Sequence, residues 1–332
     1  MQKVRVGVVG VGYLGQHHAR IFSELEDCTL TAVVDLDGER AELIARRTGA
    51  KSYTDIAAMM GKVDAVSIVV PTRNHYEVAR LFLEHGKDVL IEKPITDVVP
   101  EAQELVRFAA DRNLILAVGH LERFNAGVTR LQQTVGQPYY IESQRIAPFV
   151  PRSTDINVVL DLMIHDLDII LSIVADKRVR MIRAIGHPVL TNSIDMASAW
   201  IEFGDGCVAN ITASRVSKEK IRKLRVFQQD CYLSLDYASQ HLNVLNRIPA
   251  PDGKAMPQLV EERPTLKKIE PLRAELEEFV TSVRHRTQPR VTGRNGLEAL
   301  ELAMRVSDAI HPKIRALNLA VPGKAWSKPN AL

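Results

Sequence analysis

The sequence predicts two domains of different classes: an N-terminal α/β domain built on a doubly wound parallel sheet, and an α+β domain after it. The chain has 332 residues, more than a single hydrophobic core usually supports. Up to about residue 118, short β-branched runs alternate with helix-like stretches, the pattern of a parallel sheet. From Pro138 onward, longer β-rich segments alternate polar and apolar residues, which indicates a sheet with one covered face.

The composition excludes several classes of protein. Hydrophobic residues make up 46% and charged residues 25% of the chain, as in ordinary globular proteins. A net charge of +3 is too small to indicate nucleic-acid binding, and no apolar run approaches the roughly 18 residues of a membrane span. The chain starts without a signal-peptide pattern, and its three cysteines are scattered, so we expect a cytoplasmic protein without a zinc motif.

The first strand, within Val4 to Gly10, runs directly into a glycine loop, Gly10-Val-Gly12-Tyr-Leu-Gly15, and then into a helix from Gln16 to Glu26. In this context each glycine has a physical role. The first makes the turn, the second lets the backbone approach a pyrophosphate, and the third lets helix and strand pack closely. The loop therefore predicts a Rossmann-type dinucleotide site, with contacts from Gly10, Gly12, Tyr13, Leu14 and Gly15.

The second strand, Leu30 to Val34, ends at Asp35, twenty positions after Gly15. A carboxylate there accepts hydrogen bonds from the ribose hydroxyls and repels a 2′-phosphate, which favours NAD(H) over NADP(H). Arg46 or Arg47 nearby leaves NADP(H) open as the less favoured cofactor.

The alternation continues, and polar motifs follow each later strand of the predicted sheet. Ligands bind at the carboxyl ends of such strands. The motifs are Pro71-Thr-Arg-Asn-His75, Glu92-Lys93-Pro94 and Gly119-His120 with Glu122-Arg-Phe-Asn125. The predicted elements around them are strands at 65–70, 88–91 and 114–118 and helices at 39–48, 75–85 and 99–112.

A second candidate site lies on a helix-like stretch from Ile156 to Val174 that is apolar almost all the way round. At ~100° per residue, Asp161, His165 and Asp168 fall within a sector of roughly 60°, and Asp166 lies off this line. Asp161 is placed to orient the His165 imidazole as a proton acceptor. A structural Asp–His pair and a metal site are alternatives, although no third metal ligand is evident.

In order and spacing, the motifs GVGYLG, PTRNH, EKP, GHLERFN and DLMIHDLD resemble those of the Gfo/Idh/MocA oxidoreductases over roughly residues 4 to 310. The resemblance implies a Rossmann domain followed by a domain with a large open sheet, and hydride transfer between nicotinamide and sugar-like alcohols. It places Lys93 in the EKP motif, and Asp161 and His165 in the D-x-x-x-H motif.

These residue types suit alcohol oxidation without a metal. His165, oriented by Asp161, takes the hydroxyl proton, and Lys93 stabilises charge that develops on the substrate oxygen. Glu92 is expected to hold Lys93 and contact the nicotinamide end of the cofactor, and the Lys93–Pro94 bond is a candidate for the cis form. His75 is expected near the nicotinamide ribose or in a helix N-terminal role. Further predicted cofactor contacts are Pro71, Thr72 and Asn74.

The predicted domains cover residues 1–120, 121–311 and, as an irregular tail, 312–332. In the second domain, β segments are expected at 139–146, 179–185, 195–203, 208–215, 224–229, 231–236 and 241–246, with helices at 272–286 and 295–310. The resemblance implies that the sheet joins copies of the chain into a homodimer or homotetramer.

A finer resemblance concerns the segments GHLERFN, RIAPFVPR and DINVVLDLMIH, which look like those of the branch that acts on UDP-N-acetylhexosamines, in particular at C3 of UDP-N-acetylglucosamine. Arg145 and Arg152, just ahead of the catalytic helix, are candidates to pair with the diphosphate in bidentate fashion, and a structural or solvent-exposed role is the alternative for both. Ala126 stands where that family usually has proline. A free-sugar or inositol-type polyol dehydrogenase and a non-catalytic dinucleotide-binding regulator remain as alternatives. The predicted substrate-binding residues are Arg123, Asn125, Arg145, Arg152, Asp161 and His165.

Overall fold

The computed structural model describes residues 3–150, 156–250 and 256–316, and the chain divides into two compact units. The first unit comprises Met1–Thr129 and Lys267–Glu301, and the second comprises Arg130–Leu266 and Leu302–Leu332. The division falls inside two helices, α5 (Ala126–Thr134) and α8 (Gly293–Ala316). The predicted limits at residues 120 and 311, taken as limits of independently folding domains, stay a prediction.

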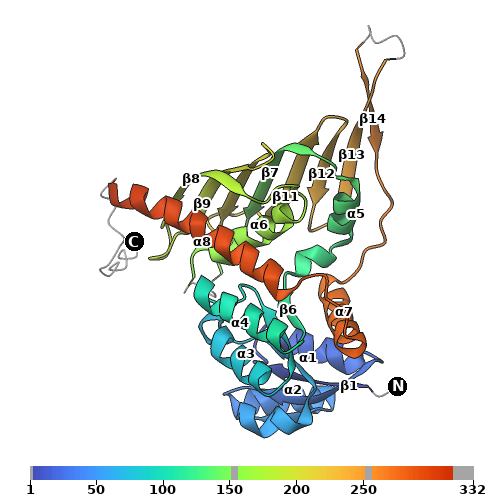
Figure 1. The fold of residues 1–332 in the computed structure, drawn as a ribbon, viewed down its shortest axis with the longest axis vertical. Helices are drawn as coiled ribbons and strands as arrows, with labels where there is room; N and C mark the ends of the chain where they lie inside the picture. Colours follow the sequence, from blue (N-terminus) through green and yellow to red (C-terminus); the bar gives the residue numbers. More distant parts are fainter. Residues whose placement is uncertain (1–2, 151–155, 251–255, 317–332) are drawn as a thin grey trace, which may run out of the picture. The chain divides into compact units, whose positions relative to one another are not determined.

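The first unit is a doubly wound α/β fold, as the sequence predicts (Figure 1). Its six strands are all parallel and follow the order β3-β2-β1-β4-β5-β6, so the strand order reverses between β1 and β4. In such a sheet, ligands bind beyond the carboxyl ends of the strands at this reversal. The strands are β1 (Val4–Val9), β2 (Cys28–Val34), β3 (Lys51–Tyr53), β4 (Ala65–Ile68), β5 (Asp88–Glu92) and β6 (Leu116–Gly119).

The helices of this unit begin and end where local chemistry favours it. Asp37 accepts a hydrogen bond from the Arg40 amide at the start of α2, and Gly49 ends that helix with a φ of 75°. Helices α4 and α7 have proline in their first turn. The helical elements are α1 (Gly15–Glu24), α2 (Gly38–Thr48), η1 (Ile56–Lys62), η2 (Thr72–Asn74), α3 (His75–Glu84), α4 (Val99–Asp111), η3 (Leu121–Phe124) and α7 (Pro271–His285).

One hydrophobic core joins β1 and β2 to α1 and to the distant helix α7. Phe22 of α1 and Phe279 of α7 are both buried in it. On α1, residues 15, 18, 19 and 22 are buried at helical spacing, so this stripe faces the sheet. Residues from the far end of the sequence therefore complete the core of the first unit.

The second unit contains an eight-stranded sheet of order β14-β13-β12-β11-β7-β10-β9-β8. Neighbouring strands are antiparallel except β7 and β10, which are parallel. The predicted mainly antiparallel sheet is thus confirmed. The strands are β7 (Pro138–Ile146), β8 (Val179–His187), β9 (Met196–Phe203), β10 (Val208–Ser214), β11 (Ile221–Gln228), β12 (Cys231–Asp236), β13 (His241–Ile248) and β14 (Gln258–Glu262).

One face of this sheet is covered and the other is open. In β9, Ala197, Ala199 and Ile201 are buried, whereas Trp200 between them is exposed. The predicted apolar helix contacts β7 and β10 and consists of a π-helical turn, η4 (Val159–Met163), that continues into α6 (Ile164–Leu171). The buried side chains of the sheet and the apolar helix therefore pack into a common core.

Strands β3 and β14 and helix α5 were not predicted from the sequence, and the last helix is longer than predicted. Helix α8 passes Pro312, whose missing N–H costs one helical hydrogen bond, so helix propensity underestimates its length. The remainder of the predicted tail, residues 317–332, lies outside the described residues. Within the described ranges, no helix combines the length and apolarity needed to cross a membrane.

Candidate active site

The glycine loop has the geometry that the sequence predicts. Gly10 has a φ of 85°, and a Cβ there would lie 2.6 Å from the carbonyl oxygen of Val69. A Cβ on Gly15 would lie 1.8 Å from the Gly10 oxygen, so only glycine lets α1 approach the turn this closely. A Cβ on Gly12 would meet no protein atom within 4 Å. Gly12 instead faces open space, where a bound group can approach the backbone.

A pocket of about 900 Å³ opens beside this loop, at the carboxyl ends of β1, β2 and β4. Among the predicted cofactor residues, Gly10, Gly12, Asp35, Pro71 and Asn74 line it. Tyr13, Leu14, Gly15, Thr72, His75, Glu92 and Lys93 are not among its lining residues. The pocket lining also contains side chains that were not predicted from the sequence, notably Leu36, Arg40, Thr54, Ile56, Arg73 and Glu77.

Arg40 holds the Asp35 carboxylate with a two-point contact. Its Nε donates to Oδ2 at 3.0 Å and its Nη2 to Oδ1 at 2.7 Å. The backbone amides of Val11 and Asp37 also donate to this carboxylate, at 2.9 and 3.0 Å. Burial alone would raise the pKa of Asp35, but these hydrogen bonds lower it overall. Asp35 is therefore a fixed anion at the end of β2.

The Glu92-Lys93-Pro94 turn begins at Glu92, the last residue of β5. Its Lys93–Pro94 bond is cis, as the sequence analysis suggested. The Lys93 amide donates to Glu92 Oε2 at 3.3 Å. The buried imidazole of His75 lies between two carbonyl oxygens, that of Pro94 at 2.8 Å from Nδ1 and that of Val70 at 3.0 Å from Nε2. His75 thus ties the turn to the loop after β4.

His75 is a buried structural side chain and does not line the pocket. Burial is the main cause of its lowered pKa, which the two carbonyl oxygens partly offset. Its predicted place near the nicotinamide ribose stays a prediction.

Arg123 and Asn125 belong to a buried polar segment after β6. Asn125 donates to the Glu122 carboxylate at 3.3 Å and accepts from the Gly127 amide at 3.0 Å. Arg290 donates to the Arg123 carbonyl at 3.2 Å, which anchors η3 to the segment after α7. The part of this segment that contacts a substrate stays a prediction.

In the second unit, Asp161 lies on the π-helical turn and His165 in the first turn of α6, and both side chains are half-buried. Asn157 caps this helix, because its Oδ1 accepts from the amides of Val159 and Leu160 at 3.0 Å each. π-Helical turns frequently mark functional sites. Asp168, predicted on the same polar line, is buried.

Arg145, predicted to bind a diphosphate, is 2% exposed and lies on the covered face of the sheet. Its Nε donates to Asp166 Oδ2 at 2.7 Å and its Nη2 to Oδ1 at 3.2 Å. This contact explains why Asp166 lies off the polar line: it joins α6 to β7. Arg152, the other predicted diphosphate ligand, lies outside the described residues.

A second buried ion pair, missed by the sequence analysis, holds the start of the same helix. Arg215 donates from Nε to Asp195 at 2.9 Å and from Nη2 to the Ile156 carbonyl at 3.0 Å. Asp195 Oδ2 also accepts three backbone amides, from residues 189 to 191. Burial opposes ionisation of Asp195, yet these donors lower its pKa to about 2.

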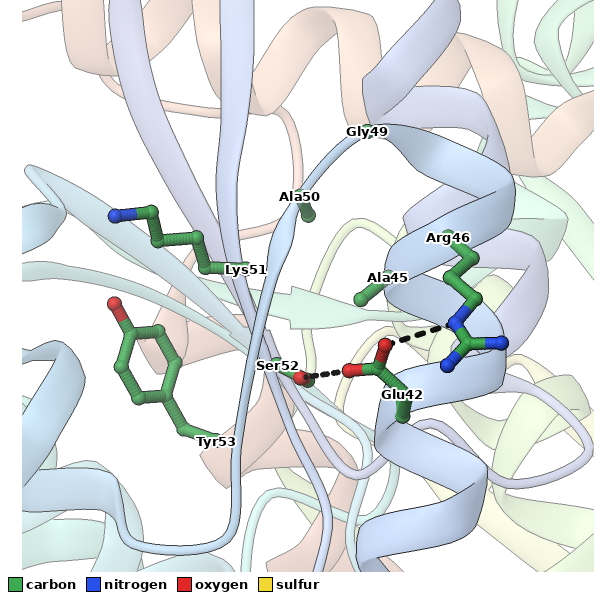
Figure 2. A pocket seen from close by; sticks show the side chains of 8 residues that line it. All are labelled: Glu42, Ala45, Arg46, Gly49, Ala50, Lys51, Ser52 and Tyr53. Carbon is green, nitrogen blue, oxygen red and sulfur yellow. Dashed lines mark hydrogen bonds and ion pairs between the residues drawn. The ribbon is translucent and has the colours of Figure 1, made fainter.

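A smaller hollow of about 440 Å³ lies between α2 and β3 (Figure 2). Figure 2 shows Glu42 between Arg46 and Ser52, which donate to it at 2.8 and 2.6 Å. Glu42 is thus paired within the hollow, at an exposed edge of the unit. Among the described residues, no group of three or more His, Cys, Asp or Glu side chains is arranged to hold a metal ion.

Comparison with known proteins agrees with this geometry. Residues 4–120 match the GFO_IDH_MocA family model, described as an oxidoreductase family with an NAD-binding Rossmann fold. The chain is 38% identical over 311 residues to UDP-N-acetylglucosamine 3-dehydrogenase of Acidithiobacillus ferrooxidans, covering 93% of this chain and 98% of that protein.

Two further comparisons extend the likeness. The solved structure of that Acidithiobacillus enzyme superposes with a TM-score of 0.87 at 37% identity, covering 94% of this chain and 99% of the other. Myo-inositol 2-dehydrogenase of Thermotoga maritima is 24% identical, over 93% of this chain and 97% of its own length. A Rossmann sheet with its glycine loop, an EKP turn, a D-x-x-x-H helix and a relative similar over nearly the whole length lead to one conclusion: the chain belongs to the Gfo/Idh/MocA family of NAD-binding oxidoreductases.

Proposed function

We propose that this chain is a dehydrogenase that oxidises the C3 hydroxyl of UDP-N-acetylglucosamine, or of a closely related UDP-N-acetylhexosamine, with NAD⁺. The observation that carries the proposal is the 38% identity, over 98% of its length, to an enzyme with this named activity. The EKP turn and the D-x-x-x-H helix are both present in the chain.

In the proposed reaction, His165 takes the proton from the substrate hydroxyl, and Asp161 orients its imidazole. Lys93 donates to the same oxygen and stabilises its developing negative charge. Bound NAD⁺ supplies the hydride acceptor. The capping of this helix by Asn157 and its attachment through Arg215 support the proposal, because general-base catalysis requires a fixed imidazole position.

The described residues fit a dinucleotide. Gly12 leaves open space beside the helix N-terminus, where a pyrophosphate binds in Rossmann folds. Asp35 at the end of β2 is suited to the ribose hydroxyls, which supports NAD(H) as the preferred cofactor. Arg40 weakens the expected preference for NAD(H), because its guanidinium can also bind the 2′-phosphate of NADP(H).

The nucleotide moiety would orient the sugar for reaction. Binding energy from a diphosphate far from the reacting carbon raises turnover as well as affinity when it fixes the sugar's position. In this proposal Arg152, Arg123 and Asn125 contribute to substrate binding. The Arg145 side chain is engaged by Asp166, so a direct contact of Arg145 with the diphosphate requires that this pair open.

That engagement favours a second candidate, a free-sugar or inositol-type polyol dehydrogenase, because one of the two arginines assigned to the diphosphate has a buried partner. NADH formation at 340 nm with saturating NAD⁺ separates the two. We expect UDP-N-acetylglucosamine to be oxidised with a higher kcat/KM than N-acetylglucosamine or myo-inositol. Equal or higher kcat/KM for a free polyol would replace the proposed substrate with that polyol.

We further propose that the open face of the eight-stranded sheet joins copies of the chain. Four aromatic rings gather on this face. The centroid of the Tyr140 ring lies 6.2 Å from that of Trp200 and 5.7 Å from that of Phe227, and the centroids of Phe227 and Tyr232 are 4.8 Å apart. An exposed aromatic cluster favours burial against another protein surface. Light scattering should give a dimer or tetramer, and Trp200→Glu should shift it towards the monomer. The rings belong to Tyr140, Trp200, Phe227 and Tyr232.

A further inference from the structure

A buried histidine of the glycine-loop helix contacts the carboxylate of the EKP turn. His18 of α1 is 0% exposed. Its Nδ1 lies 2.9 Å from Ser67 Oγ on β4, and its Nε2 lies 3.2 Å from Glu92 Oε1 at the end of β5. One imidazole on α1 therefore contacts both β4 and the last residue of β5, which directly precedes Lys93.

His18 Nε2 and Glu92 Oε1 are close enough for an ion pair but are not aligned as a hydrogen bond. Neither His18 Nε2 nor Glu92 Oε1 has a partner that meets hydrogen-bond geometry among the described residues. At 3.2 Å, each atom is nevertheless within ion-pair distance of the other. With a hydroxyl at Nδ1 and a carboxylate at Nε2, the arrangement favours a proton on Nε2.

Glu92 fits at this position because residue 119 has no side chain. A Cβ on Gly119 of β6 would lie 2.8 Å from Glu92 Oε1 and 3.0 Å from Oε2. The other oxygen of this carboxylate accepts the Lys93 amide at 3.3 Å. The position of the Lys93 backbone is therefore coupled to the position of the Glu92 carboxylate.

We propose that His18 is a positioning residue for Lys93: it holds the buried Glu92 carboxylate in place and thereby links the turn that bears Lys93 to the helix that follows the glycine loop. The inference rests on the proposed function in that Lys93 acts on the substrate oxygen. It assigns to His18 an effect on catalysis although the side chain reaches neither cofactor nor substrate.

The charges near Glu92 agree with this role. Burial of the Glu92 carboxyl would by itself raise its pKa, but His18, followed by Lys93 and His75, lowers it overall. Without the imidazole, the carboxylate would lose the group that lies 3.2 Å from its Oε1, at a residue that is only 6% exposed. It would then either take up a proton or move, and in both cases the charge facing Lys93 changes.

The test compares His18→Leu with His18→Gln, because the glutamine amide restores a donor near the position of Nε2. Gly119→Ala displaces the same carboxylate from the opposite side. His85→Gln, on an exposed histidine at the end of α3, is the control. Three quantities are measured for each variant: kcat and KM with the best substrate, the NADH dissociation constant, and the NMR resonance of ¹³C-dimethylated Lys93, assigned with Lys93→Arg.

We expect His18→Leu and Gly119→Ala to lower kcat roughly 10- to 100-fold and to change NADH affinity less than about threefold. His18→Gln should recover most of kcat, and the Lys93 resonance should move only in the two impaired variants. An unchanged kcat and an unchanged Lys93 resonance in His18→Leu, measured below its melting temperature, would overturn the inference. If the wild type oxidises no UDP-sugar, the proposed function fails, while the Lys93 resonance still tests the role of His18.

Discussion

Arg40 and Asp35 form a two-point ion pair at the end of β2, with nitrogen–oxygen distances of 3.0 and 2.7 Å. Arg40, which binds the carboxylate expected to favour NAD(H), has a guanidinium that suits the 2′-phosphate of NADP(H). We therefore expect the cofactor preference to depend on the balance between these two side chains.

The first prediction concerns that balance. Wild type should bind NADH more tightly than NADPH, and Asp35→Ser should level or reverse the preference, because Arg40 becomes free to bind a 2′-phosphate. Asp35→Ser combined with Arg40→Ala should lose the gained NADPH affinity by roughly tenfold, about 1.4 kcal/mol. Calorimetric titration measures both affinities. A wild type that prefers NADPH would refute the assignment of Asp35.

The second prediction concerns the glycine loop. Gly12→Val should abolish NADH binding, because its side chain would fill the space that the glycine leaves beside the pocket. The control is Gly61→Val, since a Cβ on Gly61 also meets nothing within 4 Å but lies outside the pocket lining. NADH fluorescence titration of both variants checks the prediction. Unimpaired binding by Gly12→Val would show that the pyrophosphate lies elsewhere.

The third prediction concerns the Arg145–Asp166 pair. Arg145→Met should cost about 3–5 kcal/mol of unfolding free energy, because it leaves a buried carboxylate without its cation. Adding Asp166→Leu should recover much of this loss. Arg225→Met, which breaks a half-exposed pair with Glu142 on the open face, should cost no more than about 1 kcal/mol. Urea unfolding gives all three values. Equal costs for the two single variants would mean that Arg145 has another role.

The fourth prediction is a pH dependence. The pKa of Asp195 is about 2 in the folded protein, against about 3.9 in an unfolded chain, which corresponds to about 2 kcal/mol of stability at neutral pH. Because the folded value is depressed, this stability is present above the unfolded pKa and disappears as the pH falls through about 4 towards 2. Unfolding at pH 7 and pH 2.5 should show a smaller pH effect in Asp195→Asn than in wild type. Asp308→Asn, on the exposed side of α8, should behave as wild type does.

The parts of the fold that the sequence predicted have strong local signals. Repeated β-branched runs separated by helical periods predicted the parallel sheet, and alternation predicted strands such as β9. The three-residue strand β3 and the wholly exposed strand β14 lack a hydrophobic pattern, so periodicity could not find them. That α7 completes the core around Phe22 depends on a contact between residues more than 250 positions apart, which no local pattern encodes.

The site was predicted less completely, for a similar reason. Motifs indicated Asp35, Lys93 and His165 as candidate site residues, with Asp161 beside His165 and Glu92 beside Lys93, but they did not indicate Arg40, Arg215 or His18. The contacts of Arg215 and His18 join residues that are far apart in the sequence, and the contact of Arg40 with Asp35 depends on the turn after β2. Only His18 had a usable signal, because it lies three residues after Gly15 on the apolar stripe of α1, where helical periodicity places it against the sheet.

The central claim is oxidation at C3 of a UDP-N-acetylhexosamine, and deuterium transfer tests it most directly. UDP-N-acetylglucosamine carrying deuterium at C3, and a second sample carrying it at C4, are each incubated with NAD⁺, and the reduced cofactor is analysed by mass spectrometry. We predict deuterated NADH from the C3-labelled sugar, unlabelled NADH from the C4-labelled sugar, and roughly 10²-fold slower formation of both with His165→Asn. Unlabelled NADH from the C3-labelled sugar, or no reduction of NAD⁺ at all, would contradict it.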